Sequence, residues 1–130
     1  MGWEADIEEL RRRERLGRAM GGPEKIKRQH DGGKLTVRER IERLIDPGSL
    51  HEIGTIAGRA EYDGSGALTA FTPANFVLGR ARIEGRRIVV AGDDFTVRGG
   101  ANDAAIKDKL LLSETMAHRL RLPLVRLVDG

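Results

Sequence analysis

The glycine pair Gly99-Gly100 is the strongest candidate in the sequence for contact with a charged ligand. It follows the segment 95–98 and precedes a stretch with helical periodicity. A glycine-rich turn at a helix N-terminus exposes backbone N–H groups, which suit a phosphate or a thioester oxygen. The same pair also fits a plain strand-to-helix turn, because glycine adopts the tight conformations that such turns need. From the residue types alone, the plain turn is favoured.

The other residue types that carry chemistry form no catalytic pattern. Asp93 and Asp94 resemble an acid–base pair, but adjacent residues on a strand point to opposite faces, so a turn or cap role is favoured. The three histidines, His30, His51 and His118, lack the spacing of metal ligands, and the chain has no cysteine. We therefore predict no catalytic residue and no metal site.

The positive charge of the chain lies in its first third. The formal net charge is +3, and residues 1–43 hold 12 Lys and Arg against 9 Asp and Glu. The arginines between 11 and 18 lie close to Glu8, Glu9 and Glu14, at spacings that allow ion pairs on a helix. A solvated, salt-bridged helix is favoured over a phosphate-binding arm. Without a nucleic-acid-binding motif, a nucleic-acid partner is not expected.

Length and composition indicate one domain with a modest core. The chain has 130 residues, of which 39% are hydrophobic and 33% charged, and such a length is typical of a single domain. No run approaches the ~18 apolar residues that a membrane-spanning helix needs. The first thirty residues carry several acidic side chains and no long apolar run, which argues against a secretory signal. We expect a cytoplasmic protein that does not enter a membrane.

Helices are expected over the first domain segment, residues 1–49. A helix is predicted at 3–20, a glycine break precedes Pro23, and a polar helical piece runs through Ile26 to about His30. Thr36 and Glu39 then have the spacing of a capping box. An amphipathic helix follows them and ends at the turn 46–49.

Residues 50–130 are expected to form an α/β unit. A short strand at 50–53 is followed by 54–75, rich in Gly, Ala and Thr without a sustained period, which predicts a long, mobile loop. Two strands at 76–84 and 86–91 flank the hairpin signal Glu84-Gly85. A helix at about 102–121 and a buried strand at 124–128 complete a β-α-β unit, which predicts parallel pairing.

Three stretches together resemble the carboxyltransferase β-type subunit of biotin-dependent acyl-CoA carboxylases, the family of the propionyl-CoA and methylcrotonyl-CoA carboxylase β chains. The first comprises Gln29-His30, 33–36, 38–41 and 44–49; the second is the segment 79–86; the third is 94–100, with Lys107, Leu122-Pro123-Leu124 and 127–129 after it. The resemblance spans about residues 25–130 in the family's order and spacing. It departs from the family at Gly130, where serine is more frequent.

The resemblance implies a partial crotonase-like fold of β-β-α units behind N-terminal helices, with 50–130 as an incomplete carboxyltransferase N-domain. Such enzymes move a carboxyl group from carboxybiotin, borne on a carrier, to the α-carbon of an acyl-CoA. Backbone N–H groups hold the developing anions, since preorganised donors need no rearrangement during the reaction. The acyl-CoA-binding residues that the resemblance implies are Val97, Arg98, Gly99, Gly100, Ala101, Asp129 and Gly130. Lys34, Arg80, Arg82, Arg86 and Arg87 are either contacts for coenzyme A phosphates or a solvated face.

Two functions follow as hypotheses. In the first, the chain is the N-terminal fragment of an acyl-CoA carboxyltransferase, inactive alone and without a cofactor of its own. Its partners would be the C-terminal carboxyltransferase half and the biotin carboxylase and biotin carrier subunits. In the second, it is a stand-alone, non-catalytic module that binds coenzyme A esters or a partner protein. In either case, apolar faces around Leu110, Leu111, Leu124 and Leu127 predict a homo-oligomer.

Overall fold

The computed structural model describes residues 2–100 and 107–129. In chain order the elements are α1 (Glu4–Arg18), α2 (Pro23–Asp31), α3 (Val37–Leu44), β1 (His51–Ile53), β2 (Gly58–Tyr62), β3 (Leu68–Pro73), β4 (Phe76–Ile83), β5 (Arg86–Asp93), a 3₁₀ turn (Arg98–Gly100), α4 (Lys107–Leu120) and β6 (Leu124–Leu127). The helices predicted near the N-terminus and the strands of the β-α-β unit are confirmed. The part of the last predicted helix at 102–106 lies outside the described residues.

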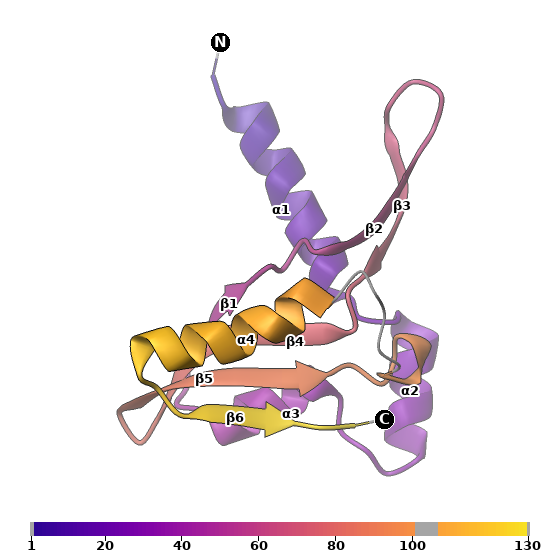
Figure 1. The fold of residues 1–130 in the computed structure, drawn as a ribbon. Coiled ribbons are helices and arrows are strands. Elements are labelled where there is room, and N and C mark those ends of the chain that lie inside the picture. Colours follow the sequence, from indigo (N-terminus) through magenta and orange to yellow (C-terminus); the bar gives the residue numbers. More distant parts are fainter. Residues whose placement is uncertain (1, 101–106, 130) are drawn as a thin grey trace.

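A four-stranded sheet with the order β1-β4-β5-β6 forms the centre of the molecule (Figure 1). β4 and β5 pair antiparallel across the predicted Glu84-Gly85 turn, and β5 and β6 pair parallel, with Val89 opposite Leu124. The parallel pair requires the crossover that α4 provides. The predicted β-α-β arrangement is therefore confirmed.

Each face of the sheet is covered by one helix. On one face Phe76, Leu78 and Val89 pack with Ala117 of α4, and on the other Val77 and Val90 pack in the cluster of α3. Successive residues of β4 thus enter different clusters, as the pleat of a strand requires. The middle of β5 is buried on both faces, as its apolar run predicts.

The strand β6 is less buried than predicted. Its residues are half-buried or exposed, so the expectation of a buried strand is wrong. The reason is its place at the end of the strand order, where only β5 pairs with it among the described residues. An apolar run such as 124–128 marks contact with the sheet, but it does not tell an edge strand from a central one.

The capping box of α3 is present. The Thr36 hydroxyl accepts from the Glu39 N–H at 3.3 Å, and the Glu39 carboxylate accepts from the Thr36 N–H at 3.1 Å. Glu39 also shares a 2.6 Å hydrogen bond with His30 of α2. The bond from His30, with those from Thr36, lowers the pKa of Glu39 to about 2. One carboxylate thus starts α3 and fixes the end of α2 beside it.

The prediction of a long loop over 54–75 is wrong. β2 and β3 form an antiparallel hairpin in that segment, closed by Asp63, whose carboxylate accepts from the N–H groups of Ser65 and Ala67. The two strands are exposed for most of their length, so no alternation of apolar and polar residues marks them. Local turn chemistry and pairing define this hairpin, not burial. Its mobility, and the division of the chain at residue 50, stay predictions.

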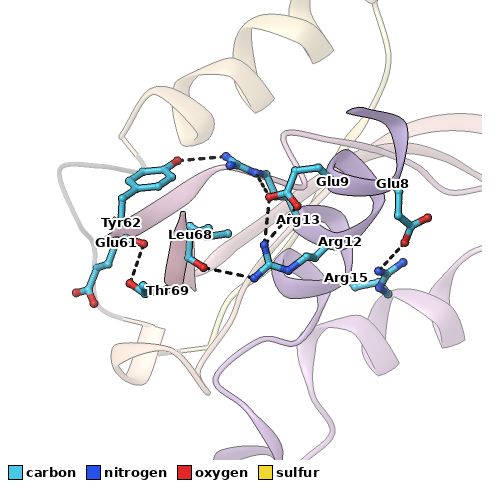
Figure 2. Close-up of polar contacts among 9 residues, drawn as sticks. All are labelled: Glu8, Glu9, Arg12, Arg13, Arg15, Glu61, Tyr62, Leu68 and Thr69. Carbon is cyan, nitrogen blue, oxygen red and sulfur yellow. Dashed lines mark hydrogen bonds and ion pairs between the residues drawn. The ribbon is translucent and has the colours of Figure 1, made fainter. Parts of the chain in front are cut away.

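The hairpin lies against α1, away from the sheet (Figures 1 and 2). Arg13 donates to the Tyr62 hydroxyl at 3.2 Å, and Arg12 donates to the Leu68 carbonyl at 3.4 Å. Glu9 lies between the two arginines and forms an ion pair with each. The predicted salt-bridged helix is therefore confirmed, and its arginines also hold the hairpin.

A largely buried ion pair connects α3 to β1. The two guanidinium nitrogens of Arg38 donate to the Glu52 carboxylate at 2.6 and 2.9 Å, and only 7% of the Glu52 side chain is exposed. Burial alone would raise the pKa of Glu52, but the hydrogen bonds from Arg38, together with the charges of Arg38, Lys109 and Arg18, outweigh it and hold the pKa below its ordinary value. Such a pair costs desolvation when formed, and removing one partner leaves a buried charge.

Replacing Arg38 tests this connection. We expect Arg38→Met to lower the free energy of unfolding at pH 7 by about 3 kcal/mol, because Glu52 is left charged and unpaired. Since the pKa of Glu52 is depressed in the folded state, the contribution is present above its unfolded pKa of about 4.3 and is lost as the pH falls through the folded pKa. The difference between variant and wild type should therefore shrink below about pH 4.

Urea unfolding across pH measures both effects. Lys27→Ala, which removes an exposed ion pair with Asp31, is the control and should change stability little. An Arg38→Met variant as stable as wild type, or a difference that does not depend on pH, would contradict the role of the pair.

Candidate functional site

The loop after β5 is shaped by one buried carboxylate. Asp94 accepts from the Thr96 N–H at 3.0 Å and from the Thr96 hydroxyl at 2.6 Å. The Val97 N–H in turn donates to the Asp94 carbonyl at 3.2 Å. Burial raises the pKa of Asp94, although the bonds from Thr96 oppose the rise. The predicted turn role of Asp94 is therefore confirmed.

The end of the loop has a left-handed backbone. Arg98, Gly99 and Gly100 have φ values of 52°, 59° and 72°. L-residues with a Cβ rarely adopt this conformation, and glycine adopts it at no steric cost. Arg98 adopts it despite its Cβ, and the two glycines continue the turn that follows the buried Val97.

The α1–α2 junction lies directly on this loop. The Gly21 N–H donates to the Thr96 hydroxyl at 2.9 Å, and a Cβ at Gly21 would lie 2.1 Å from the Thr96 carbonyl oxygen. Only glycine permits so close an approach of two backbones. The contact places α2 opposite the loop.

A cationic pocket of about 470 Å³ lies between α2 and the loop. It is lined by Lys25, Arg28, Gln29, Gly32 and Lys34 from one side and by Phe95, Thr96, Arg98 and Gly99 from the other. Four of these residues carry a positive charge, and none of the lining residues carries a carboxylate. The arrangement suits an anion, because converging cations raise the local concentration of negatively charged ligands.

An aromatic ring lies within the same pocket. The Lys34 ammonium is 4.8 Å from the centre of the Phe95 ring, and 38% of Phe95 is exposed. A cation held over a ring in this way gains from the negative face of the ring. The pocket therefore offers a flat apolar surface beside its charges.

Asp129 lies beside Lys34 at the edge of the pocket, and both its carboxylate and its backbone N–H have protein partners. Its carboxylate lies 3.2 Å from the Gln29 amide nitrogen, and 3.4 Å from each of Lys34 and Arg40. Its backbone N–H donates to Asp93 at 3.2 Å. These contacts fix the end of β6 against α2 and α3. Asp129 positions the chain and does not line the pocket.

Only some of the seven residues predicted for acyl-CoA binding lie at the pocket. Arg98 and Gly99 line the pocket, and Gly100 follows them in the same turn. Val97 is buried below the loop, and its carbonyl accepts from the Asn75 amide at 3.3 Å. Ala101 and Gly130 lie outside the described residues.

The side of the pocket formed by α2 was not predicted as a site. Lys25, Arg28 and Gly32 are spaced at i, i+3 and i+7, so they share one face of a helix. That spacing could have indicated a cationic face. The loop that lies opposite could not be inferred, because the contact of Gly21 with Thr96 joins segments 75 residues apart.

Neither a metal site nor a membrane span is found in the described part of the chain. No group of three or more His, Asp or Glu side chains at 2–100 and 107–129 is arranged to hold a metal ion. Within the same ranges, no helix has the length and apolar character to cross a bilayer.

Comparison with known proteins gives a consistent result. The family model "Carboxyl transferase domain" matches residues 28–130. The chain is 38% identical over 126 residues to the human mitochondrial propionyl-CoA carboxylase beta chain, covering 95% of this chain and 23% of the relative. It is 36% identical over 118 residues to the methylmalonyl-CoA carboxyltransferase 12S subunit of Propionibacterium freudenreichii subsp. shermanii, covering 90% and 22%. The chain thus spans about a quarter of the length of these relatives.

Solved structures resemble the fold over the whole chain. A transcarboxylase 12S crystal structure, described as a hexamer with methylmalonyl-coenzyme A and methylmalonic acid bound, superposes with a TM-score of 0.85 at 28% identity. It is matched over 100% of this chain and 26% of its own. A single-chain, multi-domain long-chain acyl-CoA carboxylase gives a TM-score of 0.77 at 28% identity, over 97% and 14% of the two chains.

Replacing Thr96 tests the construction of the pocket. Thr96→Val keeps the shape but removes the hydroxyl that donates to Asp94 and accepts from Gly21. We expect a loss of about 1–3 kcal/mol in the free energy of unfolding and a further rise in the pKa of Asp94. Urea unfolding and carboxyl NMR titration measure these effects.

Thr72→Val, an exposed position on β3, is the isosteric control. Amide exchange at Gly21 should also become faster in Thr96→Val alone. If exchange at Gly21 and the Asp94 pKa both stayed at wild-type values, the proposed link between loop and α2 would be incorrect.

Proposed function

We propose, since the chain belongs to the carboxyl transferase domain family, that it is the acyl-CoA-binding N-terminal part of an acyl-CoA carboxyltransferase. Its fold is the α/β, crotonase-like fold of such domains, of which it holds a part. The parent reaction would transfer a carboxyl group to the α-carbon of an acyl-CoA. Biotin on a carrier would supply that carboxyl group, and we assign no described residue to it.

The observation that carries the proposal is the cationic pocket between α2 and the 95–100 loop. Coenzyme A bears a diphosphate, a 3′-phosphate and an adenine ring. Lys25 and Arg28 would provide charge for the phosphates, and guanidinium groups bind phosphate oxygens in pairs. Phe95 provides an exposed ring for the adenine, since bases stack readily on aromatic side chains.

The turn at 98–100 would then approach the thioester end of the ligand. Its left-handed glycines allow the backbone to come close to a bound group. Donors that are fixed before the reaction stabilise an enolate oxygen without reorganisation. Asp129, held by three side chains, would fix the end of β6 and so position the segment after it.

The remaining parts of the enzyme are also proposals. We propose as partners the rest of the carboxyltransferase, biotin carboxylase and biotin carrier subunits, and further copies of the same chain. The alternative function is a stand-alone, non-catalytic module that binds coenzyme A esters or a partner protein. Both functions use the same pocket, so coenzyme A binding would support either one. Carboxyl transfer by the chain alone would contradict both, because only a complete enzyme would catalyse it.

We expect no carboxyl transfer by the 130-residue chain. It spans about a quarter of its curated relatives, and loss of even one oxyanion donor typically costs ~10²- to 10³-fold in rate. The assay follows transfer of carboxyl between biocytin and propionyl-CoA, with a full-length relative as positive control. Turnover clearly above background would contradict the proposed partial role.

Charge removal in the pocket should weaken coenzyme A binding. We expect Lys25→Ala/Arg28→Ala to reduce affinity about tenfold or more, because charge-assisted bonds to phosphate are lost. The affinity of wild type should also fall as salt is raised. Isothermal titration calorimetry with coenzyme A measures both changes.

The control removes the same charges outside the pocket. Lys27 pairs with Asp31 on another side of α2, and Arg43 lies in the last turn of α3. Lys27→Ala/Arg43→Ala should bind coenzyme A as wild type does. Equal weakening in both double variants would indicate a general charge effect and would contradict a specific pocket.

A further inference from the structure

A second cluster of cations lies at the opposite end of β5 from the pocket described above. Cross-strand pairing places His51 beside Arg80, and Arg82 beside Arg87. Alternate residues of a strand share a face, so Arg80 and Arg82 lie together on the face of β4 that also carries Phe76 and Leu78. We name the group His51, Arg80, Arg82 and Arg87 the arginine face.

The arginine face surrounds a hollow. A cavity of about 270 Å³ is lined by all four of its residues, with Ser49 and Ala81 beside them and Leu120 and Leu122 on the far side. The Ser49 hydroxyl is held by the Arg82 N–H at 3.1 Å. The last turn of α4 and the chain after it therefore close one side of a small basin that strands β1, β4 and β5 form.

The side chains of the arginine face have no protein counterion among the described residues. Among residues 2–100 and 107–129, the side chains of His51, Arg80, Arg82 and Arg87 make no hydrogen bond or ion pair. Like charges directly opposite each other on a sheet are destabilising. The pairing of Arg82 with Arg87 is thus unfavourable in the chain alone. An anion between the two guanidinium groups would attract both and offset their repulsion.

Two carboxylates near the arginine face, those of Glu52 and Asp46, are engaged elsewhere. Glu52, next to His51, belongs to the ion pair with Arg38 on the other face of the sheet. Asp46 accepts from the N–H groups of Glu84 and Gly85 and closes the β4–β5 hairpin. None of the residues that line the basin carries a carboxylate, so the lining is positively charged.

We propose that the arginine face binds the phosphate group of a small phosphorylated molecule. Guanidinium groups present paired N–H donors that match the oxygens of a phosphate, and three of them converge here. The volume is below the ~300–1,000 Å³ of typical drug-sized pockets, which favours a small ligand over a peptide. Leu120 and Leu122 offer an apolar wall to the organic part of a phosphate ester.

NMR titration of the ¹⁵N-labelled chain tests the proposal, with inorganic phosphate and glycerol 3-phosphate as probes at constant ionic strength. Both should shift the amide signals of 80–87, and the ester should also shift Leu120 and Leu122. A hexaglutamate peptide is the competing probe. Tighter binding of the peptide than of glycerol 3-phosphate, or equal shifts with chloride alone, would overturn the proposal.

Variants locate the effect. Arg82→Gln/Arg87→Gln should weaken glycerol 3-phosphate binding at this face at least tenfold, whereas Lys27→Ala/Arg43→Ala, outside both pockets, should leave it unchanged. Arg82→Lys keeps the charge and removes the paired donors, so it should weaken binding several-fold while preserving the fold. Undiminished binding in both arginine variants would overturn the proposal.

Urea unfolding gives a second, independent readout. Arg87→Gln removes the cross-strand repulsion, so the variant should unfold at a higher urea concentration than wild type when phosphate is absent. Added glycerol 3-phosphate should stabilise wild type more than Arg87→Gln, because the variant binds the ligand more weakly and ligand binding to the folded state raises stability. Equal stabilisation of the two would show that the arginine face does not hold the ligand.

Discussion

Two adjacent carboxylates at the end of β5 hold together the segments around the candidate pocket. Asp93 accepts from Arg126 and from the Asp129 N–H, and so fixes β6. Asp94 fixes Thr96, whose hydroxyl receives the Gly21 N–H. Because neighbouring residues of a strand point to opposite faces, one strand end can organise two different sides of the site. The position of α2 opposite the loop depends on this division.

The same organisation separates the charges of the molecule. Asp129 forms ion pairs with Lys34 and Arg40. Lys25 and Arg28 of α2 therefore remain available in the pocket for a ligand. A pocket with several cations and no carboxylate in its lining is what recognition of a phosphorylated ligand requires. In the function proposed above, that ligand is the coenzyme A moiety of an acyl-CoA.

Local signals predicted much of this structure. The Thr36–Glu39 capping box, the Glu84-Gly85 turn and the apolar run in β5 each act over a few residues, and each is present. The hairpin at 58–73 was missed because its exposed strands bury little and so show no period. The glycine turn was recognised, but its basic partner helix was not, since their contact joins distant segments. The family resemblance over 25–130 is confirmed by a match over 28–130.

The central claim is that one pocket, built by α2 and the 95–100 loop, binds coenzyme A. Mapping the ligand by two-dimensional NMR tests it most directly. On addition of coenzyme A to the ¹⁵N-labelled chain, the account predicts that the largest amide shifts fall at 25–34 and 95–99, with smaller shifts near Asp129. Largest shifts on the β2–β3 hairpin or α1, or no shifts at millimolar ligand, would contradict it.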